Sequence, residues 1–530
     1  MKIKINKTFF FWSIFSVALV SLALLQYHQL LAYHYITPPG DDPMNHYSMA
    51  INLQNGTGFW KTLKTGNYPP LYHYTVLSIS TIFHIDILKV ILWLYPIWIV
   101  LAALAIFLAG TVLFGRIGGL ISFIAYGFFA IGNTHLQNDG GYPNLIGTHI
   151  LLPLLLTEIS LLLKEKKIKL KFLWGSLAII NCILVIITHH LSTISMLAVF
   201  FASTPVLIIY YWIENKWTIK KGVTFLLGFV VILLFFDYVF FKTGLFASAR
   251  VLFTVEGVNI IQKFPYFSFS KLQDNPPWDL KLYPAEIGQA ILYVGLLGVV
   301  LLPFFYIKKE KLRLPAVLIL IVWTLFYYYG SRQNVPNNGR YIRDITVPLS
   351  LAAGGIIAVF YYLIRKFNAA VAAIFLAILA IVGHHYNETR IELGLSYNTM
   401  VRMTDADKAA TDYLLSQKDS GKLLTIGGLN TYLSIFLPKW NITSYDYSSP
   451  VTSYIYNFDY LYVTIKQQGW LPGGIVVGLP DQLELDNDII LENTFENPEK
   501  RIEIFKVIKP APQQVQTKTK TKKKVTPPTY

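Results

Sequence analysis

The sequence predicts a mainly α fold, in which a polytopic bundle of about eleven transmembrane helices precedes a C-terminal α/β domain outside the membrane. Hydrophobic residues make up 54% of the 530 residues and charged residues 14%, which is a more apolar composition than soluble domains have. The apolar residues form runs of about 20, the length of helix that crosses a bilayer. Lysine and arginine lie in short clusters between these runs. These observations exclude a disordered protein, a disulfide-rich secreted scaffold and an ordinary cytosolic enzyme.

The net charge of +15 does not indicate a nucleic-acid partner. A nucleic-acid-binding chain gathers its basic residues on a soluble fold, whereas here they flank apolar runs, so we expect no nucleic acid. The one cysteine, Cys182, lies within an apolar run. The chain can therefore form neither an intramolecular disulfide nor a cysteine metal cluster.

The N-terminus resembles a signal peptide, because the basic segment MKIKINK precedes an apolar one. The apolar segment continues to about Ala32, and no small-residue cleavage pattern follows it. We therefore predict an uncleaved first span and a transmembrane domain over residues 1–386. The eleven predicted spans are approximately residues 9–32, 87–112, 117–131, 143–163, 172–188, 191–213, 222–241, 286–306, 314–330, 345–364 and 369–386. The short third span begins beside Arg116, so spans two and three are expected to form a tight hairpin.

The distribution of lysine and arginine predicts the orientation. The N-terminus and every second gap between spans hold 18 Lys or Arg in 40 residues, and the alternate gaps hold 10 in 124. Because positively charged loops stay in the cytoplasm, we predict a multi-pass cell-membrane protein with a cytoplasmic N-terminus. With eleven spans, everything after Tyr386 is extracytoplasmic.

Residues 387–508 are predicted to form this extracytoplasmic α/β domain. Thr404 precedes acidic and apolar residues in the pattern of a capped amphipathic helix. Short β-rich runs bounded by Gly, Pro and Asn follow, over residues 422–428, 460–465, 474–480 and 502–508. The tail 509–530 consists mainly of Lys, Thr and Pro, has nothing to bury, and is predicted to be disordered.

The first outer loop, residues 33–85, opens on two adjacent carboxylates. Asp41 and Asp42 follow a Pro-Pro-Gly turn, and Pro43 suits the first turn of a helix in which His46 lies one turn along. Asp42 could simply cap that helix. The loop, however, has 53 residues and a second Pro-Pro turn at YPPLYH, which begins at Tyr68 and leads into an amphipathic segment. This is more structure than a connector needs.

Further polar residues lie at the outer ends of other spans. Asp139 precedes Gly-Gly and the Tyr-Pro that starts the fourth span, a pattern that is also typical of a helix-start turn. His189 and His190 join two spans and could be merely solvated. The last outer gap carries Arg332, Arg340, Arg343 and Asp344. Arginine on the outer face opposes the charge bias and suits phosphate, although Arg343 and Asp344 could also form a structural pair.

All these clusters fall on one predicted membrane face. Carboxylates coordinate a divalent ion or remove a proton from a hydroxyl, and arginine or histidine stabilises a departing phosphate. The co-location predicts group transfer from a lipid phosphate at the outer interface.

The pattern resembles the GT-C superfamily of polytopic glycosyltransferases, of the mannosyltransferase or arabinosyltransferase type, which use polyprenyl-phosphate-linked sugars. The motifs that carry the resemblance are GDDPMNH (40–46), YPPLYH (68–73), NDGGYPN (138–144), THH (188–190) and GRYIRDITVPLSLAAG (339–354). The resemblance implies a GT-C-like fold and a glycosyltransferase that moves a hexosyl or pentosyl group from a lipid-phosphate donor to a hydroxyl on a glycan, lipid or protein acceptor. A WWDYG-type motif of oligosaccharyltransferases is not found, which argues against transfer of a whole glycan to asparagine.

The resemblance also implies roles for individual residues. Asp41 or Asp42 would be the catalytic base or, with Asp139, would bind Mg²⁺ or Mn²⁺. The donor phosphate and its surroundings would be contacted by His46, Tyr68, Asp139, His189, His190, Arg340 and Arg343.

Two other functions remain open. A transporter or flippase of a polar lipid or glycolipid would place polar residues near the bilayer midplane and often has internal repeats, but the middles of the spans are nearly all apolar and no repeat is seen. A scaffold that works through residues 387–508 would not need eleven spans.

Overall fold

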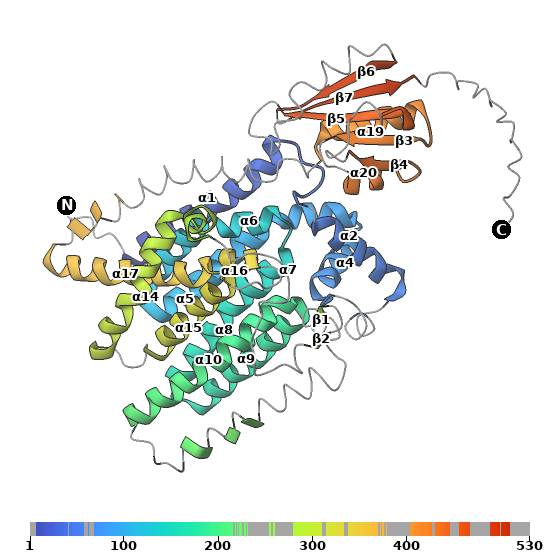
Figure 1. The fold of residues 1–530 in the computed structure, drawn as a ribbon. Coiled ribbons are helices and arrows are strands. Elements are labelled where there is room, and N and C mark those ends of the chain that lie inside the picture. Colours follow the sequence, from blue (N-terminus) through green and yellow to red (C-terminus); the bar gives the residue numbers. More distant parts are fainter. Residues whose placement is uncertain are drawn as a thin grey trace, which may run out of the picture. The chain divides into compact units, whose positions relative to one another are not determined.

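The computed structural model divides the chain into two compact units, Met1–Thr404 (unit 1) and Asp405–Tyr530 (unit 2) (Figure 1). The described residues are 7–40, 42–57, 62, 68–215, 279–309, 314–332, 338–368, 403–426, 430–445, 455–466, 488–498 and 500–508, with short pieces between 218 and 259 and between 371 and 378. The predicted domain boundary at 386 and the tail 509–530 lie outside these residues.

Within the described residues, unit 1 contains eight helices that are long and apolar enough to cross a membrane. They run over Thr8–Ala32, Ile87–Phe129, Tyr142–Lys164, Ile168–Thr188, His190–Glu214, Gln289–Tyr306, Leu314–Ser331 and Gly339–Phe367. The predicted multi-pass helical fold is thereby confirmed. The predicted spans 222–241 and 369–386 lie largely outside the described residues, so the total of eleven stays a prediction.

The second of these helices, α5 (Ile87–Ile124), reverses its direction at Gly115. This glycine has φ 84° and ψ 173°, far from helical values. A Cβ atom built on Gly110 would lie 3.0 Å from the Cα of Gly119, whereas nine residues of straight helix would separate these positions by roughly 13 Å. Residues 87–114 and 116–129 are therefore two antiparallel helices, as the hairpin prediction requires.

Small residues allow the central helices of unit 1 to pack closely. Helix α17 (Thr346–Phe367) packs against both α5 and α14 (Gln289–Lys309). A Cβ on Gly354 would collide with Ser122 of α5, and a Cβ on Gly298 of α14 would collide with the backbone of Ala352. Close backbone approach of this kind is typical of helix pairs in membranes. Helices α8 (Leu152–Lys164), α9 (Ile168–Thr188), α10 (His190–Asn215) and α15 (Leu314–Ser331) pack around them.

Several short helices of unit 1 connect the spans. Helix α2 (Asp42–Asn52) lies beside the amphipathic α4 (Leu71–Phe83) (Figure 1). Helix α16 (Asn338–Asp344) packs against both α6 (Gly132–Asn138) and α13 (Tyr283–Ile287). Helix α2 begins at Asp42, with Pro43 in its first turn as predicted. Helices α2 and α16 carry four of the predicted site residues, namely Asp42, His46, Arg340 and Arg343.

Unit 2 is built on a five-stranded mixed sheet with the order β4-β3-β5-β7-β6. Strand β3 (Lys422–Ile426) pairs in parallel with β4 (Asn441–Ser444) and β5 (Tyr460–Lys466), while β7 (Lys500–Val507) pairs antiparallel with β5 and β6 (Ile489–Glu496). Helices α19 (Asp405–Gln417) and α20 (Asn430–Phe436) accompany the sheet. Aliphatic and aromatic residues supply its apolar core, which includes Leu424, Leu461, Val463 and Phe505. The predicted C-terminal α/β fold is confirmed, and the predicted strand 474–480 lies outside the described residues.

Candidate functional site

Two glycine turns bring the predicted acidic motifs GDDP and NDGG into contact. Gly40 has φ 102°, and a Cβ on it would collide with the carbonyl oxygen of Asn138. Gly140 has φ 81°, and a Cβ on it would collide with the ring of Pro43. Both positive φ values favour glycine. The two turns, almost one hundred residues apart in sequence, therefore interlock through their backbones.

Asp42 and Arg340 form an ion pair across this contact. Their closest oxygen and nitrogen atoms lie 2.5 Å apart, and the side chains retain 35% and 21% of their exposure. A Cβ on Gly141 would lie 2.6 Å from a guanidinium nitrogen of Arg340, so the absence of a side chain at Gly141 makes room for this guanidinium group. Asp41, the other predicted base, lies outside the described residues.

Tyr68 lies among four histidines. Its ring centroid is 5.8 Å from that of His46, 5.6 Å from His73, 5.8 Å from His189 and 5.1 Å from His190. His46 and His73 also approach each other, with 3.0 Å between Nδ1 and Nε2. Helices α2, α4 and α10 and the junction before α10 thus converge on one tyrosine. His73 was not predicted, although it ends the YPPLYH motif.

Burial keeps the imidazoles of this cluster uncharged. The pKa of His46 is lowered to about 3, mainly by burial and further by the charge of Arg340. The hydrogen bond to the Gly140 carbonyl acts in the opposite direction and raises this pKa. Burial and the neighbouring His46 lower the pKa of His73 well below its ordinary value. Burial, then His190 and Arg340, lower the pKa of His189 in the same way. The cluster therefore offers neutral hydrogen-bonding groups beside one permanently charged guanidinium.

Asp139 and Arg343 belong to a second polar cluster. The guanidinium of Arg343 donates to Asp139 and, from Nε at 3.2 Å, to Glu286, which also lies 3.1 Å from Nδ1 of His135. Burial alone would raise the pKa of Glu286, but its contacts with His135 and Arg343 outweigh burial and lower the pKa to about 2. Arg343 is thus held between two carboxylates, and its predicted contact with phosphate stays a prediction.

A metal site is not apparent in the described part of the chain, where no three His, Cys, Asp or Glu side chains are placed to hold an ion. Asp42 and Asp139 instead each bind an arginine, which supplies the positive charge that a metal would bring. The described residues therefore do not fit the predicted Mg²⁺ or Mn²⁺ site as they stand.

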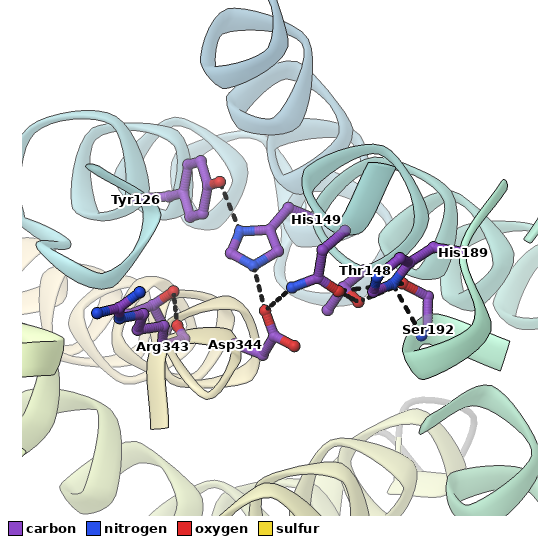
Figure 2. A network of polar contacts seen from close by, with 9 residues as sticks. Tyr126, Thr148, His149, His189, Ser192, Arg343 and Asp344 are labelled. Atoms are coloured by element: carbon purple, nitrogen blue, oxygen red, sulfur yellow. Dashed lines mark hydrogen bonds and ion pairs between the residues drawn. The ribbon is translucent and has the colours of Figure 1, made fainter. Parts of the chain in front are cut away.

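A buried chain of hydrogen bonds extends from the histidines into the helix bundle (Figure 2). It joins the imidazole of His189 to Ser192, Ser192 to Asn144, and Asn144 to Asp344, which also binds His149. Thr148 and His149 lie on η3 (Leu145–Leu151), a π-helical segment of the kind that is frequent at functional sites. Of this chain, sequence analysis predicted His189 as a site residue and named Asp344 as a possible structural partner.

Solved structures show which fold this is, although no family model and no curated protein matches the sequence. The archaeal oligosaccharyltransferase AglB from Archaeoglobus fulgidus, in complex with an inhibitory peptide and a dolichol-phosphate, has a TM-score of 0.52 to this chain. The match has 13% identity and covers 86% of this chain and 69% of AglB. The Archaeoglobus fulgidus oligosaccharyltransferase tethered with an acceptor peptide has a TM-score of 0.51, with 13% identity over 87% of this chain and 69% of that chain. The chain has the GT-C fold.

Two further GT-C structures are similar to it. ArnT from Cupriavidus metallidurans, bound to undecaprenyl phosphate, has a TM-score of 0.48 with 10% identity over 92% of this chain and 98% of ArnT. The arabinofuranosyltransferase AftD from Mycobacteria has a TM-score of 0.46, with 11% identity over 93% of this chain and 39% of AftD. The GT-C fold expected from the outer motifs is confirmed by AglB. The structure also gathers Asp42, His46, Tyr68, His189, His190 and Arg340, while their chemical roles remain predictions.

Proposed function

We propose that this GT-C protein is an integral-membrane glycosyltransferase that moves a sugar from a polyprenyl-phosphate donor to an acceptor hydroxyl on the extracytoplasmic face. The observation that supports this best is the convergence of a carboxylate, a guanidinium and neutral imidazoles around Tyr68. Such a set can accept a proton and hold a phosphate within the same site. AglB, which shares the fold, was solved with a dolichol-phosphate, and this supports a lipid-linked donor.

The proposed reaction is a single displacement. The carboxylate of Asp41 or Asp42 removes the proton from the acceptor hydroxyl, and the acceptor oxygen forms a bond to the anomeric carbon of the sugar. The bond between that carbon and the phosphate oxygen breaks, and its electron pair leaves with the polyprenyl phosphate. The proton passes from the aspartic acid to solvent, so the products are the glycosylated acceptor and the lipid phosphate. The acceptor is a glycan, lipid or protein hydroxyl.

Arg340 is the cation best placed to receive the departing phosphate. Its pair with Asp42 is partly exposed, so another anion can compete for the guanidinium more easily than it could for a fully buried pair. A donor phosphate can therefore replace Asp42 as the partner of Arg340, which frees the carboxylate to act as a base. No step requires a metal.

Separate Asp41→Asn and Asp42→Asn variants test the proposal. We expect the variant that lacks the base to lose roughly 10²-fold or more of its sugar transfer from a polyprenyl-phosphate donor in membranes, because general base catalysis contributes this much. Asp86→Asn is the matched control, since Asp86 caps α5 from the same outer loop and asparagine caps equally well. Full activity in both test variants would refute base catalysis by this motif. Donor flipping without chemical change would indicate a transporter instead.

A further inference from the structure

The buried chain of hydrogen bonds behind His189 has a defined direction, which begins at Asp344 (Figure 2). A carboxylate only accepts hydrogen bonds, and its Oδ1 lies 2.9 Å from Nδ2 of Asn144 and 2.9 Å from Nε2 of His149. Both nitrogens therefore donate. Nδ1 of His149 then accepts from the hydroxyl of Tyr126 at 2.7 Å. The side chains of Asp344 and His149 are fully buried, so water does not compete for these bonds.

The orientation of Asn144 follows from its bond to Asp344. Because its amide nitrogen faces the carboxylate, its Oδ1 faces the other way and accepts the hydroxyl proton of Thr148. Thr148 lies 3.0 Å and Ser192 3.2 Å from this oxygen, and the two hydroxyl oxygens are 2.8 Å apart. A Cβ on Gly147 would collide with the hydroxyl of Ser192. Ser192 is thus fixed both by hydrogen bonds and by close packing.

Ser192 in turn determines the tautomer of His189. Its backbone N–H donates to Nδ1 of His189 at 3.3 Å, and its hydroxyl donates its one proton to the same atom at 3.0 Å. An N–H group can only donate, so Nδ1 carries a lone pair. In an uncharged imidazole the single proton must then be on Nε2.

The other neighbours of His189 belong to the cluster around Tyr68. The His189 ring stacks on His190 with 4.8 Å between centroids, and Tyr68 lies 5.8 Å away. No hydrogen bond to Nε2 of His189 comes from the residues that the structure describes. The charge of Arg340 reaches this imidazole as well.

We propose that Ser192 is a positioning residue that holds His189 as its Nε2–H tautomer, and that this N–H donates a hydrogen bond to the phosphate of the lipid-linked sugar. The proposal rests on the proposed function for the identity of the ligand. A neutral donor beside Arg340 adds a hydrogen bond to the phosphate without repelling the guanidinium. The buried Asn144 and Asp344 keep Ser192 in place.

The first experiment measures binding of undecaprenyl phosphate to the full chain in detergent, with undecaprenol and inorganic phosphate as comparison ligands. We expect Ser192→Ala to weaken binding of undecaprenyl phosphate about three- to tenfold, the effect of one hydrogen bond. Thr193→Val is the matched control, because the Thr193 hydroxyl bonds the carbonyl of His189 rather than its ring. His189→Gln, which places its amide nitrogen near Nε2, should bind at least threefold more tightly than His189→Asn, which places it near Nδ1.

Unchanged binding by Ser192→Ala, or equal binding by the glutamine and asparagine variants, would overturn the proposal. If the wild-type chain bound undecaprenyl phosphate no better than undecaprenol, the lipid-phosphate donor of the proposed function would be refuted. The lipid phosphate would then also be refuted as the ligand of His189. If inorganic phosphate bound as tightly as undecaprenyl phosphate, the ligand of His189 would be free phosphate rather than a lipid phosphate.

The second experiment does not depend on any ligand. Solid-state ¹⁵N NMR of histidine-labelled protein, with His189→Gln to identify the signals, reports which ring nitrogen carries the proton. We expect an unprotonated Nδ1 in the wild-type chain and in Thr193→Val, and a partly protonated Nδ1 in Ser192→Ala, which keeps the backbone N–H donor but loses the hydroxyl donor. A protonated Nδ1 in the wild type would overturn the positioning role while leaving the proposed function intact.

Discussion

Arg340 and Arg343 lie one turn apart on α16, yet their guanidinium groups take different partners. Arg340 pairs with the partly exposed Asp42, whereas Arg343 is buried between Asp139 and Glu286. The desolvation of a buried pair makes its loss costly, while an exposed pair exchanges readily. Arg340 is therefore suited to meet a substrate, and Arg343 to hold α16 against the turn that carries Asp139.

The Glu286 carboxylate should make a pH-dependent contribution to stability. Its pKa of about 2 in the folded protein lies below the ordinary value of 4.5, so it stabilises the fold above pH 4.5 and loses this effect as the pH falls towards 2. A shift of this size corresponds to roughly 3 kcal/mol at neutral pH. We expect Glu286→Gln to be less stable than the wild type at pH 7, with a difference that shrinks below pH 4.5 in unfolding experiments. A difference between Glu286→Gln and the wild type that stayed constant between pH 7 and pH 3 would contradict an ionised, paired Glu286.

Residues of the candidate site could be predicted only where a local sequence signal marked them. Asp42 and Asp139 were found because Pro and Gly mark their turns, and His189 because it joins two spans. Glu286 and His135 were missed because they lie 57 and 208 residues from Arg343 in sequence. Glu286 meets Arg343, and His135 meets Glu286, only through helix packing. No spacing rule relates partners that tertiary structure alone brings together.

At the scale of elements, the hairpin within Ile87–Phe129 depends on one backbone conformation. The φ and ψ of Gly115 fall in a region that is essentially restricted to glycine. We expect Gly115→Ala to destabilise unit 1 by about 1–3 kcal/mol, as measured by denaturant unfolding in detergent. Gly175→Ala is the control, because a Cβ there meets nothing within 4 Å and alanine favours the helix. Equal stability of the two variants would argue against the reversal at Gly115.

Long apolar helices and β-rich runs were predictable, whereas short elements were not. The strand Asn441–Ser444 has four residues and pairs in parallel with β3. Its alternation of apolar and polar residues is too short to be detected in the sequence. The helices α6 and α13 have seven and five residues, less than the window in which helical periodicity becomes visible. These short helices carry His135 and Glu286, which explains why part of the candidate site was not predicted.

At the scale of the whole molecule, the charge distribution predicts which face each segment occupies. The prediction can be tested with single cysteines, after Cys182→Ala removes the one native thiol. We expect a membrane-impermeant maleimide to label Ser420→Cys, in unit 2, on intact cells, and to label Lys166→Cys, in the loop between α8 and α9, only after lysis. Both positions are exposed in the structure. The reverse pattern would invert the orientation, and labelling of both on intact cells would show that the number of spans between them is even.

The contact between the turns at Gly40 and Gly140 couples the first outer loop to the loop before Tyr142. Because backbone atoms and a proline ring, rather than flexible side chains, form the contact, neither acidic turn can shift without carrying the other. The spacing between Asp42 and Asp139 is therefore preset before any substrate arrives. On the proposed function, a rearrangement that admits the lipid and the acceptor would move both turns together or leave both in place.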